Sequence, residues 1–555
     1  MAGLMQKEGK KMKCNGNGKS YLKRAFSLAL ACCLLLSLAA CGGEGGTQEE
    51  GEDASLVIAT YSTGRCFMDP HQTTDYGDYD RMNQVYDTLV TADFDGSTIK
   101  AGLAHSWDVS EDGLTYTFHL KDNVKFHSGK AMTSEDVKYT YDRWRDPKTA
   151  SSTFPFVAAI ESIDTPDDYT VVLNLSQPDP NLLINFTVPV AGILNKDTVE
   201  QAEAEGKVYG TEVIDGTGPF IFKEFVENDH IAFTRNDEYA WGPEIYSNKG
   251  PAHIKELTIR YLPEAGTRMM EFQAGNIDIF GNGCVVASEL ANLEKEDYVG
   301  VAHFTPPYPV FVAFQLNHVT DKAVRQACNM AVDRKEIIHT VMADTCDPLL
   351  GPLPSNNEWY WKGTDNYYPY DLEAANKLLE DNGYVMKDDG YRYKDGKQLG
   401  FDLIYSNQEN KMAGNLLQAQ MKKIGLNINL DESHYNDFWD FINSNDFDAM
   451  VFELYINTPE DMLYEYMSSK HIPYPNRQGY SDPQTDEWLE KAKITMDTEE
   501  RQALYDKIQE VCMESAMFLP MYNRNGFIVY NNRVKDFKPH PTIVEGMPKM
   551  LDVYK

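Results

Sequence analysis

The sequence predicts an α/β protein with more than one domain, and three observations lead to that prediction. The chain has 555 residues, whereas single domains usually hold about 100–200. From Ser55 onward, short strand-like runs alternate with capped helices. Between about residues 310 and 515 this alternation includes a strand, a helix and a second strand with a long connection, the pattern of a parallel βαβ unit.

The first forty residues predict a secretory signal peptide. Six basic residues between Lys10 and Arg24 precede the run AFSLALACCLLLSLAA, which is shorter than the ~20 residues of a membrane-spanning helix. The run ends in LAAC, which resembles the cleavage box of bacterial lipoproteins, whose cysteine becomes the lipid-modified first residue. We expect residues 1–40 to be removed and Cys41 to carry the lipid. The alternative is an ordinary cleavage near Ala40.

The segment after Cys41 and the net charge of the chain limit which partners the protein can have. Residues 41–54 have neither apolar periodicity nor aromatic residues, so we expect a flexible tether. The chain carries 51 Lys and Arg against 85 Asp and Glu, and removing residues 1–40, with seven and one of these, leaves a net charge of −40. This charge excludes a nucleic-acid partner, because phosphate binding needs a basic surface. It also disfavours adhesion to anionic lipids, so membrane attachment would have to be covalent.

Five cysteines remain outside the signal and its cleavage site. Their number is odd, their spacings are long and no CxxC occurs, so neither a zinc cluster nor a disulfide framework is predicted. A single disulfide among them stays open. They are Cys66, Cys284, Cys328, Cys346 and Cys512.

The stretch DVSEDGLTYTFHL, residues 108–120, begins like a calcium loop, with alternating short polar side chains and a glycine in sixth place. Position twelve is His119, whereas such a loop needs a bidentate carboxylate there to complete its oxygen cage. The residues from Leu114 onward alternate between apolar and polar, the period of a half-buried strand. We therefore predict a β-hairpin with an Asp-Gly turn, whose first strand is HSWDV.

Capped helices follow the hairpin. Thr133 and Asp136 form the capping box of a helix in MTSEDVKYTYDRW, and Pro147 ends that helix. The segment at 320–338 predicts two consecutive helices, the second of which begins with a capping box at Asp333 and Glu336. The stripe Val324, Ala327, Cys328 and Ala331 on the first of them should be core.

The α/β segment predicts where a ligand would bind. A helix at 370–384 buries Ala375, Leu378 and Leu379 and ends at an Asn-Gly C-cap. FDLIYS and LNINL are predicted strands around a helix, and FDAMVFELY is a strand covered on both faces. Ligands of open α/β sheets lie beyond the carboxyl ends of the strands. Two segments qualify, SNQEN at 406–410 and YINTPED at 455–461, although each is also compatible with an ordinary polar loop.

Catalytic motifs are missing from the sequence. HExxH, GxSxG and GxxxxGK do not occur, and the twelve histidines include no i,i+4 pair. GNGCVV at 281–286 begins like a dinucleotide fingerprint but lacks the third glycine. We expect no cofactor and no metal, and a secreted α/β chain without a catalytic constellation indicates binding.

A long series of ordered motifs resembles one family. Leu103 to Trp144 is similar to the signature of family 5 bacterial extracellular solute-binding proteins, the oligopeptide-, dipeptide- and nickel-binding lipoproteins of ABC importers. The resemblance runs from about residue 55 to 540. It continues through GTGPFIFKEF, EAGTRMMEFQAGNIDI, VRQACNMAVDRKEI, YDLEAANKLLEDNGY, LLQAQMKKIGLNINL, DFDAMVFELYINTPED and YSDPQTDEWLEKA.

The resemblance implies a two-lobed periplasmic-binding-protein-like fold of class II, cluster C type. The first lobe would hold residues 55–305 and 520–555, with an extra subdomain at about 96–210, and the second lobe residues 306–519. The chain would cross between lobes near TPPYPVF and MFLPM. A ligand would be held by both lobes only in the closed form, so it would shift the open–closed equilibrium.

The family also implies partners. The closed, monomeric receptor would dock on ABC permease subunits at the extracytoplasmic face of the cell membrane, held there by its lipid anchor, and separate ATPase subunits would supply energy. The absence of a phosphate-loop motif from this sequence agrees with that division.

This sequence departs from the family at the ligand amine. Peptide-binding members carry an Asp shortly after the strand equivalent to FDAMVFELY, and here that place falls at or near Asn457. An amide adds no opposite charge to an ammonium group. Glu453, Glu460 or Asp461 is a potential substitute. Candidate ligand residues are Arg65, Phe67, Tyr308, Trp359, Trp361, Asn407, Tyr455 and Asn457.

We therefore predict a non-enzymatic receptor that captures peptides for an ABC importer. The alternatives are the same role for an oligosaccharide or another polar solute, a secreted hydrolase at the cell surface, and a sensor that presents captured peptide.

Overall fold

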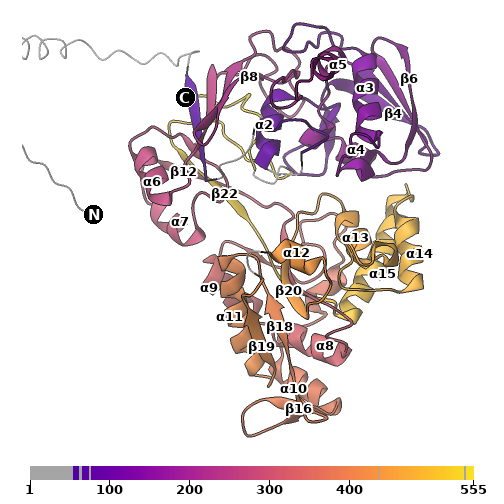
Figure 1. Cartoon of the computed structure of the whole chain (residues 1–555), viewed down its shortest axis with the longest axis vertical. Helices are drawn as coiled ribbons and strands as arrows, with labels where there is room; N and C mark the ends of the chain where they lie inside the picture. Colours follow the sequence, from indigo (N-terminus) through magenta and orange to yellow (C-terminus); the bar gives the residue numbers. More distant parts are fainter. Residues whose placement is uncertain (1–53, 62–65, 74–76, 435–436, 543–545) are drawn as a thin grey trace, which may run out of the picture. The chain divides into compact units, whose positions relative to one another are not determined.

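The computed structural model describes residues 54–61, 66–73, 77–434, 437–542 and 546–555. The predicted signal peptide, Cys41, the tether and Arg65 lie outside these ranges. Two large β-sheets organise the described chain (Figure 1). Within the described ranges, every helix is too short or too polar to cross a bilayer.

The first sheet has seven strands in the order β12-β22-β11-β1-β10-β9-β8. β1, the strand predicted at Ser55, pairs in parallel with both β10 and β11. We call the part of the chain built around this sheet the first lobe. Its strands are β1 (Ser55–Thr60), β8 (Phe220–Val226), β9 (His230–Arg235), β10 (Glu256–Tyr261), β11 (Ile279–Phe280), β12 (Val299–Phe304) and β22 (Gly526–Asn531).

A four-stranded sheet, ordered β4-β5-β7-β6, shares the hydrophobic core of the first lobe. β4 and β5 form the predicted hairpin. In its turn, Asp112 Oδ1 accepts hydrogen bonds from Ser110 Oγ at 2.6 Å and from the Leu114 amide at 3.1 Å, so these short polar side chains stabilise the turn. The strands are β4 (Ala104–Val109), β5 (Thr115–Leu120), β6 (Ile160–Asp167) and β7 (Thr170–Leu175).

Helix α3 (Ser134–Arg145) packs on this small sheet and confirms the predicted capping box. Thr133 is its N-cap, with Asp136 bonded back to the Thr133 amide at 3.0 Å. The helix ends before Pro147, and Val137, Tyr141 and Trp144 are fully buried. The other first-lobe helices are α2 (Gly77–Val85), α4 (Leu182–Asn185), α5 (Lys196–Ala204), α6 (Ala265–Gln273) and α7 (Ala287–Leu293).

The second sheet has six strands in the order β14-β21-β13-β20-β18-β19. β18 pairs in parallel with β19 and with β20, and α11 (Gln408–Lys422) connects β18 to β19, so the predicted βαβ unit is confirmed. We call the part of the chain built around this sheet the second lobe. Its strands are β13 (Pro309–Phe314), β14 (Asp347–Pro348), β18 (Gly400–Ile404), β19 (Asn427–Asp431), β20 (Ala449–Glu453) and β21 (Phe518–Asn523).

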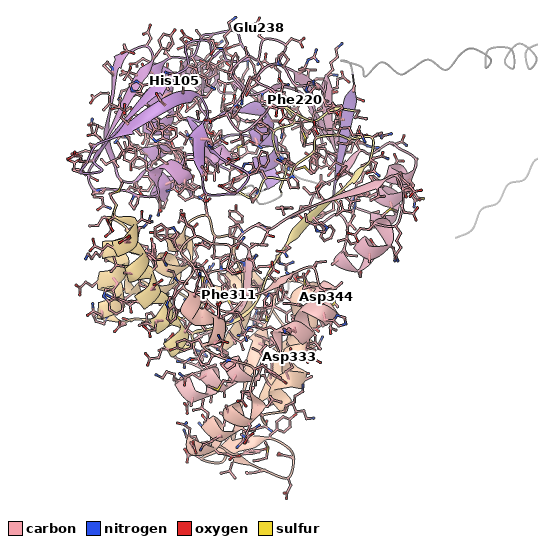
Figure 2. The ribbon with its side chains drawn as sticks, turned by 180° about the vertical axis from the view of Figure 1, so that it is seen from behind. His105, Phe220, Glu238, Phe311, Asp333 and Asp344 are labelled. Carbon is pink, nitrogen blue, oxygen red and sulfur yellow. The ribbon has the colours of Figure 1, made fainter. Side chains whose placement is uncertain are left out.

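Helices cover both faces of the second sheet (Figure 1). Successive side chains of β13 point to opposite faces: Val312 packs with α8 to α11, whereas Phe311, labelled in Figure 2, packs with α12 to α15. Leu378 is only half-buried, whereas Ala375 and Leu379 are buried as predicted. The helices are α8 (Lys322–Ala331), α9 (Arg334–Met342), α10 (Leu372–Asp381), α12 (Phe438–Ile442), α13 (Leu463–Met467), α14 (Pro483–Ala492) and α15 (Thr498–Ser515).

The chain passes between the two sheets twice within the described residues. β12 leads into β13 through residues 305–308, and β21 of the second sheet leads into β22 of the first sheet through residues 524–525 (Figure 1). Both passages lie near the predicted crossings. The exact lobe boundaries stay a prediction.

The five cysteines outside the signal region are all buried free thiols. Burial raises the pKa of Cys66 and of Cys346 to about 11 and that of Cys328 to about 12. Because the thiolate is the reactive form, these side chains serve as core residues.

Candidate functional site

The carboxyl ends of β18 and β20 meet at one edge of the second sheet, because the two strands are parallel. Asn407, which follows β18, is the N-cap of α11 and accepts a hydrogen bond from the Asn410 amide at 2.8 Å. Its Nδ2 donates to Glu453 Oε1, at the end of β20, at 3.2 Å. The structure thus joins the two loops in which the sequence predicts the ligand site.

Arg524, on the second passage between the sheets, neutralises this edge. Its Nη2 lies 2.7 Å from Glu453 Oε2 and 2.7 Å from Glu409 Oε1. Burial alone would lower the pKa of Arg524, but the two glutamate charges outweigh it and raise this pKa well above its usual value. We call Glu409, Glu453 and Arg524 the crossing cluster.

Tyr308 flanks the crossing cluster from the first passage. Its carbonyl oxygen accepts a hydrogen bond from the Arg524 amide at 3.0 Å, and its ring centre lies 5.8 Å from Arg524 Cζ. Asn523 Oδ1 accepts a hydrogen bond from the Tyr308 amide at 2.9 Å. Two predicted ligand residues, Tyr308 and Asn407, therefore both adjoin the Arg524–Glu453 pair.

Residues 454–461, which we call the site loop, follow β20 and reach into the first lobe. Tyr455 Oη donates a hydrogen bond to the carbonyl oxygen of Pro541 at 3.0 Å. Asp461 Oδ2 accepts hydrogen bonds from the amides of Asn457 and Thr458, each at 2.7 Å, and so fixes the loop. Burial raises the pKa of Asp461 to about 7, although these two bonds act in the opposite direction.

Asn457 presents an unused hydrogen-bond donor. Its Nδ2 is buried and has no hydrogen-bond partner among the described residues. An unpaired buried donor costs about 1–3 kcal/mol, and an acceptor atom of a bound solute would remove this cost. The amide at this position therefore suits a carbonyl or hydroxyl oxygen.

The far end of the site loop forms a second polar cluster. Glu460 Oε1 accepts hydrogen bonds from Arg501 Nη2 at 3.0 Å and from Tyr505 Oη. Asn181, between β7 and α4 of the first lobe, donates to Glu460 Oε2 at 2.7 Å and accepts from Arg501 Nη2 at 2.5 Å. We call Asn181, Glu460, Arg501 and Tyr505 the interlobe cluster.

The predicted aromatic residues separate into different surroundings. Trp359 is buried, with its ring 4.7 Å from Arg501 Cζ and 5.3 Å from the Tyr505 ring, so it packs under the interlobe cluster. Trp361 is half-buried beside Tyr367, with ring centres 6.1 Å apart. Phe67 is half-buried in the first lobe, and its role as a ligand residue stays a prediction.

The three carboxylates proposed as substitutes for the family's aspartate all have protein partners. Glu453 pairs with Arg524 and Glu460 with Arg501, while Asp461 binds two backbone amides. A ligand ammonium would have to compete with these partners. The described residues also contain no group of three or more His, Cys, Asp or Glu side chains placed to hold a metal ion.

Sequence reasoning missed the residues that unite these clusters. Arg524 carried a usable signal, because a lone arginine directly after an apolar strand, in an acidic chain, requires an acidic partner. Asn181 carried none. Its partner Glu460 is 279 residues away, and no local pattern reports such a contact.

Comparison with known proteins agrees with this architecture. The family model described as "Bacterial extracellular solute-binding proteins, family 5 Middle" matches residues 98–473. The heme-binding protein A of Haemophilus influenzae is 27% identical, covering 94% of this chain and 97% of that protein. The oligopeptide-binding protein AppA of Bacillus subtilis is 26% identical, covering 93% and 96%.

A solved structure shares the fold. The ABC transporter-associated periplasmic binding protein DppA from Helicobacter pylori, in complex with the peptide STSA, superposes with a TM-score of 0.73 at 26% identity and covers 90% of this chain and 98% of its own. The predicted two-lobed α/β fold is confirmed. Members of this family are substrate-binding proteins of ABC importers. This chain belongs to the bacterial extracellular solute-binding proteins of family 5.

Proposed function

We propose that this protein is the substrate-binding lipoprotein of an ABC importer, and that it captures peptides between its two lobes and delivers them to a membrane permease. The observation that carries the proposal is the double role of the site loop. One short segment holds the candidate ligand residues Tyr455 and Asn457 and also contacts the first lobe through Pro541 and Asn181. Occupancy of the site is thereby coupled to closure of the lobes.

The chemistry of the site favours a solute rich in hydrogen-bond acceptors. Asn457 Nδ2 offers a buried donor, and Tyr308 and Tyr455 provide half-buried aromatic surface. Peptide carbonyl groups are acceptors at regular spacing, and aromatic rings pack against peptide side chains. The names of two similar proteins point the same way, since one binds oligopeptides and the other was solved with a tetrapeptide.

A second ligand class, a polar solute such as an oligosaccharide, is favoured by one specific observation. Glu453, Glu460 and Asp461 already have protein partners, so the described residues of this loop do not supply a ready charge for a peptide's terminal ammonium. Sugar hydroxyls need no such charge, and the apolar face of a sugar ring can pack on the same aromatic residues.

Attachment and delivery complete the proposal. Lipid modification of Cys41 would hold the protein at the extracytoplasmic face of the membrane, and residues 41–54 would give it reach. The monomer would then dock on the permease, while separate ATPase subunits drive transport. A Cys41→Ala variant should leave the membrane fraction for the medium. Membrane retention of that variant would overturn the lipid anchor.

A thermal-shift screen tests the ligand class. A pool of tetrapeptides and a pool of oligosaccharides are compared on the purified protein, because a solute at 100 times its Kd adds about 2.7 kcal/mol of stability. We expect shifts with peptides and their recovery intact by mass spectrometry. A response to sugars alone would reverse the ligand class, and cleaved peptides would indicate a hydrolase.

A further inference from the structure

Asn181 is the one side chain of the interlobe cluster that the first lobe contributes. Its carboxamide donates to Glu460 Oε2 at 2.7 Å and accepts from Arg501 Nη2 at 2.5 Å. One amide therefore bridges both members of an ion pair whose own N–O distance is 3.0 Å. Hydrogen bonds to charged groups are about twice as strong as neutral ones.

The second-lobe partners of Asn181 are held rigidly. The side chains of Arg501 and Glu460 are 5% and 13% exposed. Arg501 Cζ lies 4.7 Å from the Trp359 ring and 5.3 Å from the Tyr505 ring, and Tyr505 Oη also donates to Glu460. Because the ion pair is complete within the second lobe, loss of Asn181 leaves neither charge unpaired. The Asn181 amide stabilises the contact between the lobes only when the lobes are together.

A second contact lies beside the first. The turn of the β4–β5 hairpin approaches the second lobe, and a Cβ atom on Gly113 would lie 3.0 Å from Met496 Cγ and 3.3 Å from Pro178 Cβ. Gly113 has a φ of +69°, a conformation that glycine adopts without strain. The hairpin that begins like a calcium loop thus contacts the other lobe.

We propose that Asn181 is a positioning residue that determines how much of the protein is closed before any solute binds. Its two charge-assisted hydrogen bonds exist in the closed arrangement and are lost on opening. The apparent affinity for a solute scales with the fraction of protein in the binding-competent state, so Asn181 strengthens binding without having to touch the solute. This inference rests on the two-lobed fold and not on the identity of the ligand.

The charged groups around Asn181 favour a neutral amide over a carboxylate at this position. Asp179, in the same first-lobe segment, interacts electrostatically with Glu460, Arg501 and Lys493, and burial together with the Glu460 charge raises the pKa of Asp179 to about 6. A carboxylate at position 181 would add a further like charge beside Glu460. A neutral amide avoids this repulsion and still offers both a donor and an acceptor.

The test is small-angle X-ray scattering of the ligand-free protein, whose lack of bound solute is verified by mass spectrometry. The variants are Asn181→Ala and the matched control Asn174→Ala. Asn174 lies on β7, shortly before Asn181, and its Nδ2 donates to Ser162 Oγ at 3.1 Å and to Asp164 Oδ2 at 2.9 Å, both in the first lobe. Both variants lose two side-chain hydrogen bonds, but only Asn181→Ala loses hydrogen bonds to the second lobe.

We expect Asn181→Ala to increase the radius of gyration, with about a tenfold fall in the closed-to-open ratio, while Asn174→Ala matches the wild type. Glu460→Ala combined with Arg501→Ala removes both second-lobe partners of Asn181, so adding Asn181→Ala to that double variant should change little. Equal radii for Asn181→Ala and wild type would overturn the proposal, as would equal expansion by the control. Because no solute is present, a wrong ligand class would not affect this result.

Discussion

The crossing cluster and the interlobe cluster have the same chemistry and different placements. Each pairs one arginine with glutamate, Arg524 with Glu409 and Glu453 in one and Arg501 with Glu460 in the other. All members of the first cluster belong to the second lobe or to the passage that leaves it. The second cluster adds an amide from the first lobe. We infer that the part-buried cluster inside one lobe stabilises that lobe, whereas the ion pair bridged across the lobes affects their separation.

The largest effect should come from the crossing cluster. Replacing Arg524 with Met leaves two part-buried glutamates without their cation. Breaking a fully buried pair costs about 3–5 kcal/mol, whereas an exposed pair contributes about 0–1 kcal/mol. We expect the free energy of unfolding of the second lobe to fall by an intermediate amount, about 2–3 kcal/mol. Urea unfolding followed by tryptophan fluorescence measures it.

Lys377→Met is the matched control for that comparison. Lys377 pairs with Asp381 on the surface of α10, with side chains 72% and 60% exposed, and such i,i+4 pairs contribute about 0.3–0.5 kcal/mol. A loss below about 1 kcal/mol for Arg524→Met, similar to the control, would show that the crossing cluster does not stabilise the lobe.

An intermediate effect depends on pH and on Asp461. The pKa of this carboxyl is raised to about 7 in the fold, against about 3.9 in an unfolded chain. The folded protein then binds the proton more tightly, so the free energy of unfolding falls as pH rises from about 4 to 7 and stays lower above that.

Asp461→Asn should remove this pH dependence while keeping an acceptor for the Asn457 and Thr458 amides. We expect the variant to be about 1–3 kcal/mol more stable than the wild type at pH 8 and equal to it near pH 4. This free-energy difference is smaller than the change in pKa alone would give, because the Asp461 side chain is partly exposed. Parallel pH profiles of the two proteins would contradict the assignment.

The smallest effect concerns Asn457 in the site loop. Asn457→Ala removes a buried unpaired donor, so the ligand-free protein should be at least as stable as the wild type. Affinity for the best peptide from the screen should fall about fivefold, since one hydrogen bond contributes about 1 kcal/mol. Isothermal titration calorimetry measures this, and unchanged affinity would remove Asn457 from the site.

Local sequence patterns predicted the helices and strands, whereas the candidate site depends on contacts between residues far apart in the sequence. The Thr133 capping box, the β4–β5 hairpin and the β18–α11–β19 unit follow from side chains a few residues apart, so the sequence displays them. Asn407 was predicted at the carboxyl edge of the sheet because parallel strands end together, and the structure places it beside the end of β20. The pairing of Arg524 with Glu453 beside Asn407, and the hydrogen bond of Asn181 to Glu460, depend on chain segments that only the tertiary fold brings together.

Hydrogen–deuterium exchange with and without the best solute tests most directly whether occupancy and closure are one event. We predict that bound solute slows exchange both in the site loop, residues 454–461, and in the first-lobe segment 179–182 that contacts it. Protection of the site loop alone, with unchanged exchange at 179–182, would mean that the solute binds one lobe without bringing the other against it.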